Sequence, residues 1–429
     1  MNRLRNILFT CIMVMLTCSV LGLECINKVA PSLAVKPEST DVEKRNYVQS
    51  DDVLSASFVN GEAQSLFEQY MADGTPFRDA MLFGNAGLQR QIIKCAATVF
   101  GYPAFPTFFD SKYNEQPANG LVFRNVMDVP TDDMVARDAW ISTMNDAARK
   151  HPEVRFSVAV LADTPQSETN PTYDLTSGNK VNSTWIKENI LSRLDPRLNA
   201  VLDPINKTAK IEKYCYNTDL HWTMERALDT YNRIGAELGW KRWDWKDPIC
   251  VIDEWYGSES RSGLDQTYAS TLWDLPIPFD NLEFHQLVDG QLKKKVTHNP
   301  GRRADALASR DGKMVQDNVY DGYVKYYGAY QGSMVNKGPN NGKNCLLIGD
   351  SFSYCQKRYI ADNYAVTYTY LPGNKTIEMS LEDMIVNHEI DDVIFIAQVF
   401  KYQQYALHSP KFLGLEDSEA VAPDDDSEG

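Results

Sequence analysis

The segment from residue 344 to 400 constrains the fold most, because short apolar runs alternate there with helix signals. The pattern predicts, in order, a buried strand at 345–348, a helix at about 351–362, a strand at 364–371, a helix at 380–388 and a buried strand at 392–397. This succession of strands and helices implies a parallel sheet with right-handed crossovers. Earlier in the chain, a helix at 131–150 and a strand at 156–162 repeat the pattern. We therefore predict an α/β fold.

The remaining stretches differ in composition. Residues 53–100 are predicted to be mainly helical, and the proline-rich residues 101–130 to form loops and short strands. Residues 241–340 are rich in tryptophan and tyrosine, and they fit either long loops that shape a cleft or a folded insertion with its own packing. We predict one domain over 53–410 that contains this insertion. A polar linker at 24–52 precedes it, and an acidic, disordered tail at 411–429 follows it.

The N-terminus has the pattern of a targeting segment. Arg3 and Arg5 precede an apolar run from Ile7 to Leu23, which predicts a signal peptide or an N-terminal anchor over 1–23. Cleavage after Gly22 is favoured over anchoring, and export to an extracytoplasmic location, secreted or periplasmic, is expected. Eight cysteines occur, of which six would remain after cleavage, and their pairing is open among fifteen arrangements. A mixture of buried thiols with at most one or two bridges is preferred.

Charge and residue spacing exclude several kinds of partner. The net charge of −15 disfavours a nucleic acid or an anionic membrane surface, whereas a neutral glycan fits it. No Cys/His cluster has the spacing of a zinc site, so no metal is expected. The sequence gives no reason to expect a cofactor.

Ser351 stands where such a fold places its chemistry. It lies just beyond the end of the predicted strand at 345–348, and ligands of parallel sheets bind beyond the carboxyl ends of the strands. A serine hydroxyl needs a base before it can act as a nucleophile, and near neutral pH that base is usually histidine. Of six histidines, His221 stands out because Asp219 precedes it by two residues. In an extended segment these two side chains face the same side, so Asp219 would orient the imidazole ring.

Each of these residues also has a structural explanation. A serine after a strand is often only a helix N-cap, and a histidine followed by tryptophan is often a packed surface feature. The joint occurrence of Asp219, His221 and Ser351 in an exported α/β chain favours a catalytic set. The predicted helix that follows, closed by Gly239, would keep the histidine segment rigid.

The run Gly349-Asp350-Ser351-Phe352-Ser353 resembles the first block of the SGNH hydrolase family. It is not the G-x-S-x-G elbow, because residue 353 is serine. The Asp-x-His-Trp motif at 219–222 comes before this block. That order resembles the DHHW and alginate O-acetyltransferase-like branch of the SGNH superfamily. Weaker similarity at 70–79, 255–258 and 261–263 extends the resemblance over most of residues 55–405.

The resemblance implies a three-layer, SGNH-like (flavodoxin-like) fold with a central parallel sheet, circularly ordered motifs and the long insertion. It implies Ser351 as nucleophile, His221 as general base and Asp219 as the acid that orients it. It also implies acetyl as the group and an extracytoplasmic polysaccharide as substrate or acceptor. A membrane-bound partner would supply acetyl groups to a transferase of this type. One departure is Leu220, where the family name expects a histidine.

The oxyanion hole is less well defined, because the family's glycine and asparagine blocks cannot be placed. The backbone N–H of Ser351 is a reasonable first donor, and Gln398, at the end of the last predicted strand, is a candidate second donor. Asp350 is expected to support the turn. Trp222 and the aromatic residues of the insertion would either stack on sugar rings or pack.

Three alternatives remain open. A transferase and an esterase would share the same triad and differ in whether sugar or water accepts the acyl group. A protein of another class, which binds carbohydrate or assists polysaccharide assembly without catalysis, could retain the fold. A metal-dependent hydrolase is weakly supported, because the histidines are scattered.

Overall fold

The computed structural model describes the following residues: 48, 50–57, 62–73, 78–102, 104–106, 113–116, 118, 120–124, 134–161, 170, 181–202, 214–262, 267–277, 279–288, 291–294, 322–327, 332–370, 379–399, 401 and 409–413. The chain divides into two compact units. One comprises residues 1–111 and 261–266, and the other residues 112–260 and 267–429. The predicted leader and almost all of the predicted linker lie outside the described residues, as does the tail beyond residue 413. No helix in the described ranges is long and apolar enough to cross a bilayer.

The first unit is helical, as predicted for residues 53–100. It contains α2 (Ser50–Ser55), α3 (Glu62–Asp73) and α4 (Arg78–Phe100), and β1 (Phe105–Pro106) follows. The Asp73 carboxylate, buried at the end of α3, accepts a hydrogen bond of 3.0 Å from the Val48 N–H. This bond ties the segment before α2 to the end of α3.

The second unit is built on an eight-stranded sheet with the order β5-β4-β13-β11-β12-β10-β8-β9. The first five strands are mutually parallel, and the last three alternate in direction. The predicted parallel sheet is therefore confirmed in its larger part. The strands are β4 (Arg155–Leu161), β5 (Asn199–Leu202), β8 (Leu282–Val288), β9 (Gln291–Lys294), β10 (Gly332–Asn336), β11 (Asn344–Gly349), β12 (Val366–Tyr370) and β13 (Asp392–Gln398).

The parallel strands follow a doubly wound order. Counted from β11 as the first strand, with β4 and β5 as fourth and fifth, they lie in the order 2-1-3-4-5. The order changes direction between β11 and β13, and in such sheets ligands bind at this switch point, beyond the carboxyl ends of the strands. Ser351 lies two residues after the end of β11.

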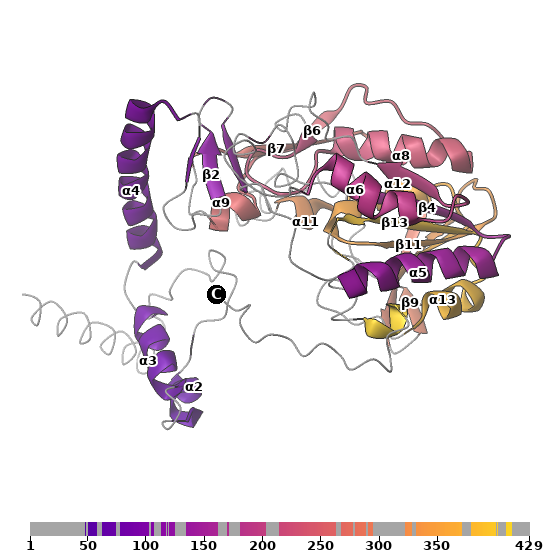
Figure 1. The fold of residues 1–429 in the computed structure, drawn as a ribbon, viewed down its shortest axis with the longest axis horizontal. Coiled ribbons are helices and arrows are strands. Elements are labelled where there is room, and N and C mark those ends of the chain that lie inside the picture. Colours follow the sequence, from indigo (N-terminus) through magenta and orange to yellow (C-terminus); the bar gives the residue numbers. More distant parts are fainter. Residues whose placement is uncertain are drawn as a thin grey trace, which may run out of the picture. The chain divides into compact units, whose positions relative to one another are not determined.

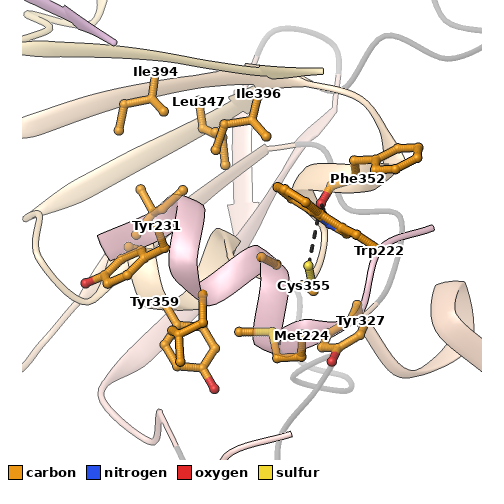
Figure 2. Packing of buried hydrophobic residues seen from close by; sticks show 14 of the residues in the cluster. Trp222, Met224, Tyr231, Tyr327, Leu347, Phe352, Cys355, Tyr359, Ile394 and Ile396 are labelled. Carbon is orange, nitrogen blue, oxygen red and sulfur yellow. Dashed lines mark hydrogen bonds between the residues drawn. The ribbon is translucent and has the colours of Figure 1, made fainter. Parts of the chain in front are cut away.

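Helices cover both faces of this sheet (Figure 1), which gives three layers. On one face lie α8 (Met224–Leu238) and α12 (Lys357–Ala361), and on the other α5 (Met134–Lys150) and α13 (Leu381–Asn387). The α8 face buries a large apolar cluster that includes Tyr231, Leu347 and Ile394 (Figure 2). The α5 face is anchored by Trp140, whose ring centroid lies 4.9 Å from that of Phe395.

Several helix ends follow the expected local chemistry. The Ser380 side chain accepts a hydrogen bond from the Asp383 N–H and so caps α13. Gly239 ends α8 with φ of 74°, a left-handed conformation that glycine adopts at little cost. The predicted helix at 351–362 is only partly correct. A 3₁₀ turn, η5 (Ser351–Ser353), comes first, and α12 begins at Lys357.

The predicted insertion at 241–340 contributes to the main sheet, because β8, β9 and β10 all fall within it. It also forms a separate hairpin from β6 (Ile249–Trp255) and β7 (Ser270–Asp274), and a short helix, α11 (Gly322–Tyr327). No disulfide joins any two of the cysteines in the described ranges, which are Cys95, Cys215, Cys250, Cys345 and Cys355.

Candidate active site

The turn after β11 is tied to the neighbouring strand β13. Gly349 lies so close to β13 that an added Cβ would overlap the carbonyl oxygen of Ile396. The Asp350 N–H donates to that same oxygen over 3.3 Å. The Asp350 carboxylate accepts hydrogen bonds from the Gln398 N–H at 2.9 Å and the Phe352 N–H at 3.0 Å. Ser351 is therefore held at the switch point between the two strands.

Asp350 lies at the start of the turn, where the sequence predicts a supporting residue. It is the N-cap of the 3₁₀ turn and is 3% exposed. Burial raises the pKa of its carboxyl group, although the two backbone N–H donors and the charge of Lys401 oppose that effect. Its two oxygens are occupied by the backbone of the turn and of β13, so Asp350 shapes the turn.

His221 lies in a tight hairpin loop. Cys215 and Trp222 form an isolated antiparallel bridge, and the Tyr216 N–H donates to the His221 carbonyl oxygen at 3.1 Å. Within the loop, Asp219 Oδ1 accepts a hydrogen bond of 2.9 Å from the backbone N–H of His221. The expected extended arrangement of Asp219 and His221 is therefore wrong. The two side chains meet because the loop folds back on the Asp219 carboxylate.

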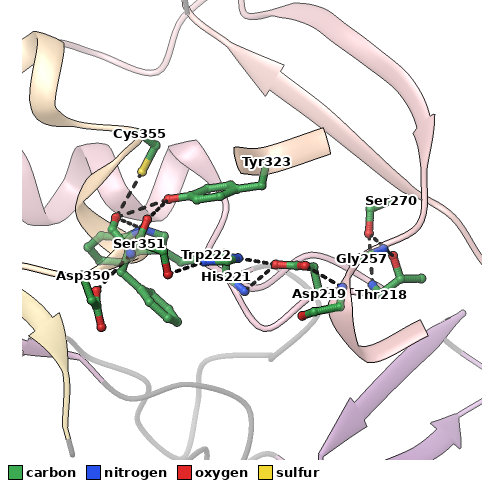
Figure 3. A network of polar contacts seen from close by, with 12 residues as sticks. Thr218, Asp219, His221, Trp222, Gly257, Ser270, Tyr323, Asp350, Ser351 and Cys355 are labelled. Atoms are coloured by element: carbon green, nitrogen blue, oxygen red, sulfur yellow. Dashed lines mark hydrogen bonds and ion pairs between the residues drawn. The ribbon is translucent and has the colours of Figure 1, made fainter. Parts of the chain in front are cut away.

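The three residues predicted as a catalytic set are brought together in one hydrogen-bonded chain (Figure 3). His221 Nδ1 lies 2.5 Å from Asp219 Oδ1, and His221 Nε2 lies 2.7 Å from Ser351 Oγ. An ionised carboxylate can only accept, so Nδ1 carries the proton and Nε2 is left as an acceptor for the Ser351 hydroxyl. Asp219 and His221 are 3% and 7% exposed, whereas Ser351 is half-buried. Access to this chain is therefore from the serine end.

The Asp219 carboxylate is kept ionised by its partners. Burial alone would raise its pKa, but the charge and hydrogen bond of His221 and the N–H groups of Ser258 and His221 outweigh burial, so the pKa is lowered. The Ser258 N–H donates to Asp219 Oδ2 over 2.8 Å, so both oxygens have donors. Gly257 packs directly on Asp219 and leaves no room for a Cβ there.

A second set of contacts fixes the loop through Thr218. Its N–H donates to Ser270 Oγ at 3.0 Å, and its hydroxyl lies 2.8 Å from the same atom. The Thr218 hydroxyl also accepts the Gly257 N–H at 3.0 Å. Thr218 and Ser270 are fully buried, so β7 and the loop after β6 hold the Asp219–His221 loop rigidly (Figure 3).

Trp222 is placed differently from the stacking role considered for it. Its indole is fully buried, and Nε1 donates a 2.8 Å hydrogen bond to the carbonyl oxygen of Phe352, in the turn at residues 351–353. A side chain with no exposed surface cannot stack on a sugar, so the stacking interpretation is wrong and packing is correct. Trp222 joins the His221 hairpin to the turn that carries Ser351.

Tyr323 is a site residue that the sequence did not single out. Its ring stacks on the His221 imidazole, with centroids 4.1 Å apart and an interplanar angle of 11°. Its hydroxyl donates to the carbonyl oxygen of Ser351 at 3.0 Å. In the sequence it is one of five tyrosines between residues 320 and 330, and no neighbouring residue distinguishes it from the other four.

The two donors expected for an oxyanion hole, from Ser351 and Gln398, differ in the hydrogen bonds that their backbone N–H groups make. The backbone N–H of Ser351 has no acceptor among the described residues, so it can serve a ligand. The backbone N–H of Gln398 is used by Asp350. As a candidate second donor, Gln398 would therefore have to act through its half-buried side chain.

An open hollow of about 340 Å³ lies near these residues. Its lining includes Trp245, Trp273, Thr223, Glu225 and Tyr216, and we call it the Trp273 hollow. Trp273 is 45% exposed and is the one exposed tryptophan of eight, all of which are in the described part of the chain. The Tyr216 ring contacts that of Tyr323 at 6.0 Å, so one aromatic ring separates the hollow from the ring stacked on His221. Within the described ranges, no group of three acidic, histidine or cysteine side chains could hold a metal ion.

Comparison with known proteins gives a likeness of fold. No family model matches the chain, and no curated protein matches it. PatB1 of Bacillus cereus, solved with a sulfonyl adduct, matches with a TM-score of 0.51 and 16% identity, over 70% of this chain and 95% of PatB1. A DHHW family protein from Eubacterium siraeum matches with a TM-score of 0.48 and 12% identity, over 67% and 94% of the two chains. The O-acetyltransferase domain of Pseudomonas putida AlgJ matches with a TM-score of 0.33 and 10% identity, over 67% and 89%.

The likeness to PatB1 shows a shared fold. A DHHW family protein and an O-acetyltransferase domain, the kinds of protein that the sequence resembles, are among the matched structures.

Proposed function

We propose that this protein transfers or hydrolyses O-acyl groups through a serine ester, with Ser351 as nucleophile, His221 as general base and Asp219 as the residue that orients the base. The observation that carries the proposal is the unbroken hydrogen-bonded chain from Asp219 Oδ1 through both ring nitrogens of His221 to Ser351 Oγ. This is the constellation that activates serine in unrelated hydrolases. It also favours an enzyme over a carbohydrate-binding protein without catalytic activity.

The proposed chemistry follows from the protonation states. Ser351 Oγ attacks the acyl carbonyl carbon while its proton passes to His221 Nε2. The imidazolium so formed is stabilised by Asp219, whose pKa is lowered. The free N–H of Ser351 would donate to the oxyanion of the tetrahedral intermediate. His221 then returns the proton to the leaving oxygen, and an acyl-serine remains until a sugar hydroxyl or water accepts the group.

Acetyl is the proposed group, and a neutral polysaccharide is the proposed acceptor or substrate. The family resemblance supports the acetyl group, and the O-acetyltransferase domain among the matched structures accords with it. The net charge of −15 favours an uncharged glycan. Two tryptophans, a glutamate and two threonines are among the residues that line the Trp273 hollow, a combination of aromatic and polar groups that suits a sugar ring.

Export completes the proposal. The charged and apolar pattern of residues 1–23 would direct the chain out of the cytoplasm. The proposed polysaccharide lies in that extracytoplasmic space. A transferase at that location needs acetyl groups from a membrane-bound donor protein, which the resemblance implies as a partner. An esterase needs no such donor.

The test is an assay of the purified chain with an activated acetyl ester, with and without a neutral glycan. We expect wild-type turnover to fall at least about 10³-fold in Ser351→Ala and in His221→Ala. Product on the glycan would indicate transfer, and release of acetate alone would indicate hydrolysis. Turnover that is unchanged in both variants would overturn the proposed triad.

A further inference from the structure

Tyr323 comes from a separate part of the chain and touches both His221 and the turn at residues 351–353, which we call the nucleophile turn because it carries Ser351. It lies in α11, within the aromatic insertion, and is 1% exposed. Its ring is nearly parallel to the His221 imidazole, at 4.1 Å and 11°. Phe352 packs on the same imidazole in a tilted arrangement at 5.0 Å. Rotation of the imidazole away from Ser351 would therefore have to displace a buried aromatic ring.

The Tyr323 hydroxyl restrains the backbone of Ser351, the hydrogen-bond partner of His221. It donates to the carbonyl oxygen of Ser351 at 3.0 Å and lies 3.3 Å from that of Phe352. Burial raises the pKa of this hydroxyl well above its ordinary value, so it remains a donor over the working pH range. Trp222 donates to the same Phe352 carbonyl oxygen at 2.8 Å. The nucleophile turn is thus held by two residues, each connected to His221.

We infer that Tyr323 is a positioning residue, which holds His221 and Ser351 in reactive register. The inference rests on the proposed function. The ring restrains the base and the hydroxyl restrains the nucleophile, so the two restraints can be removed separately. A misplacement of about 1 Å between reacting groups can cost on the order of 100-fold in rate. The aromatic insertion therefore contributes to the catalytic machinery as well as to the sheet.

The experiment measures how fast Ser351 reacts with phenylmethylsulfonyl fluoride, followed by intact mass on the full chain. In this reaction Ser351 Oγ forms a bond to sulfur, fluoride leaves, and the serine proton passes to His221. We expect Tyr323→Phe, which keeps the ring, to react about 10-fold more slowly, and Tyr323→Leu about 100-fold more slowly. Tyr326→Phe is the matched control. It lies on the same helix and its hydroxyl bonds to Asp274 at 3.1 Å, away from the triad, so its rate should stay within about twofold of wild type.

A second readout separates positioning from general stability. The proton on His221 Nδ1 can be observed by NMR as a low-field resonance, because it lies in a short hydrogen bond to Asp219. We expect this resonance to persist in Tyr323→Phe and Tyr326→Phe and to broaden or shift in Tyr323→Leu. A variant that is only less stable, and still folded at the assay temperature, would retain it.

The outcomes are distinguishable. If wild-type Ser351 is sulfonylated but folded Tyr323→Leu reacts within twofold of wild type, Tyr323 is not a positioning residue and the proposed triad stands. If Tyr323→Leu does not fold, Tyr323→Phe decides, and an unchanged rate overturns the inference. If wild-type Ser351 does not react and Ser351→Ala retains ester turnover, the proposed function fails and the inference fails with it.

Discussion

Gly257 lies directly against Asp219, and an added Cβ at residue 257 would overlap the Asp219 side chain and the carbonyl oxygen of Thr218. We expect Gly257→Ala to push the Asp219–His221 loop away from Ser351. Ester turnover should fall roughly 100-fold, and the free energy of unfolding should fall by about 1–3 kcal/mol. Gly87→Ala is the control, because a Cβ there meets nothing within 4 Å and lies in helix α4. Equal activity of the two variants would contradict the close packing.

Trp222→Phe tests whether this buried tryptophan supports the site. The change removes the 2.8 Å hydrogen bond to the Phe352 carbonyl oxygen and leaves space in a fully buried position. We expect a loss of about 1–3 kcal/mol in unfolding free energy and a lower kcat, with KM for a neutral glycan unchanged. The measurements are thermal unfolding and steady-state kinetics. A rise in KM with unchanged kcat would contradict the supporting role of Trp222.

Asp219→Asn should change how stability depends on pH. The folded-state pKa of Asp219 lies below its ordinary value of 3.8, so the ionised carboxylate stabilises the fold above that pH. This contribution is lost as the pH falls through the folded-state pKa. The difference in Tm between wild type and Asp219→Asn should therefore shrink as the pH is lowered from about 6 to about 3, a change readily followed by thermal scans. Turnover should drop about 10³–10⁴-fold at neutral pH, because an amide cannot enforce the required tautomer.

Asp195→Asn is the matched control for that experiment. The pKa of Asp195 is lowered to about 2 by its hydrogen bonds with Arg197, and it lies outside the site. The difference in Tm between wild type and Asp195→Asn should also shrink as the pH is lowered, and turnover should be unchanged. A loss of activity at Asp195, or a Tm difference for Asp219→Asn that grows at low pH, would contradict the assigned electrostatics.

The sheet and its helices were predictable because their signals are local. Apolar runs and caps placed β11, β13 and α13 within two residues, and the serine after β11 marked the end of a strand. The helix at 351–362 was overpredicted, because residues 351–353 form a 3₁₀ turn, in which the Ser353 and Tyr354 N–H groups donate three residues back, and the α-helix begins only at Lys357. Sequence periodicity over so short a span does not distinguish a 3₁₀ turn from the first turn of an α-helix.

The candidate site was predictable only in part. The pairing of Asp219 with His221 could be inferred from their spacing, but the loop that achieves it depends on Thr218 and Ser270, which lie far apart in the sequence. Tyr323 carries no local signal, since its role comes from a helix packed against residues remote in the chain. Trp222 was ambiguous because a tryptophan beside a catalytic histidine can face either the ligand or the core. Only the burial of Trp222 in the folded structure decides between these two orientations.

Trp273→Ala tests the proposed glycan site. Loss of an exposed indole that lines the Trp273 hollow should raise KM for a neutral hexasaccharide acceptor or substrate roughly 3–10-fold, in line with about 0.5–1.5 kcal/mol for one aromatic contact. Turnover of a small acetyl ester should not change, because Asp219, His221 and Ser351 are not among the residues that line the hollow. Val386→Ala, on α13 at the opposite face of the sheet, removes a comparably exposed apolar side chain and should leave both parameters unchanged. If Trp273→Ala slowed the small ester and left KM for the glycan unchanged, the hollow would matter to the fold of the site, and the glycan would have to bind elsewhere.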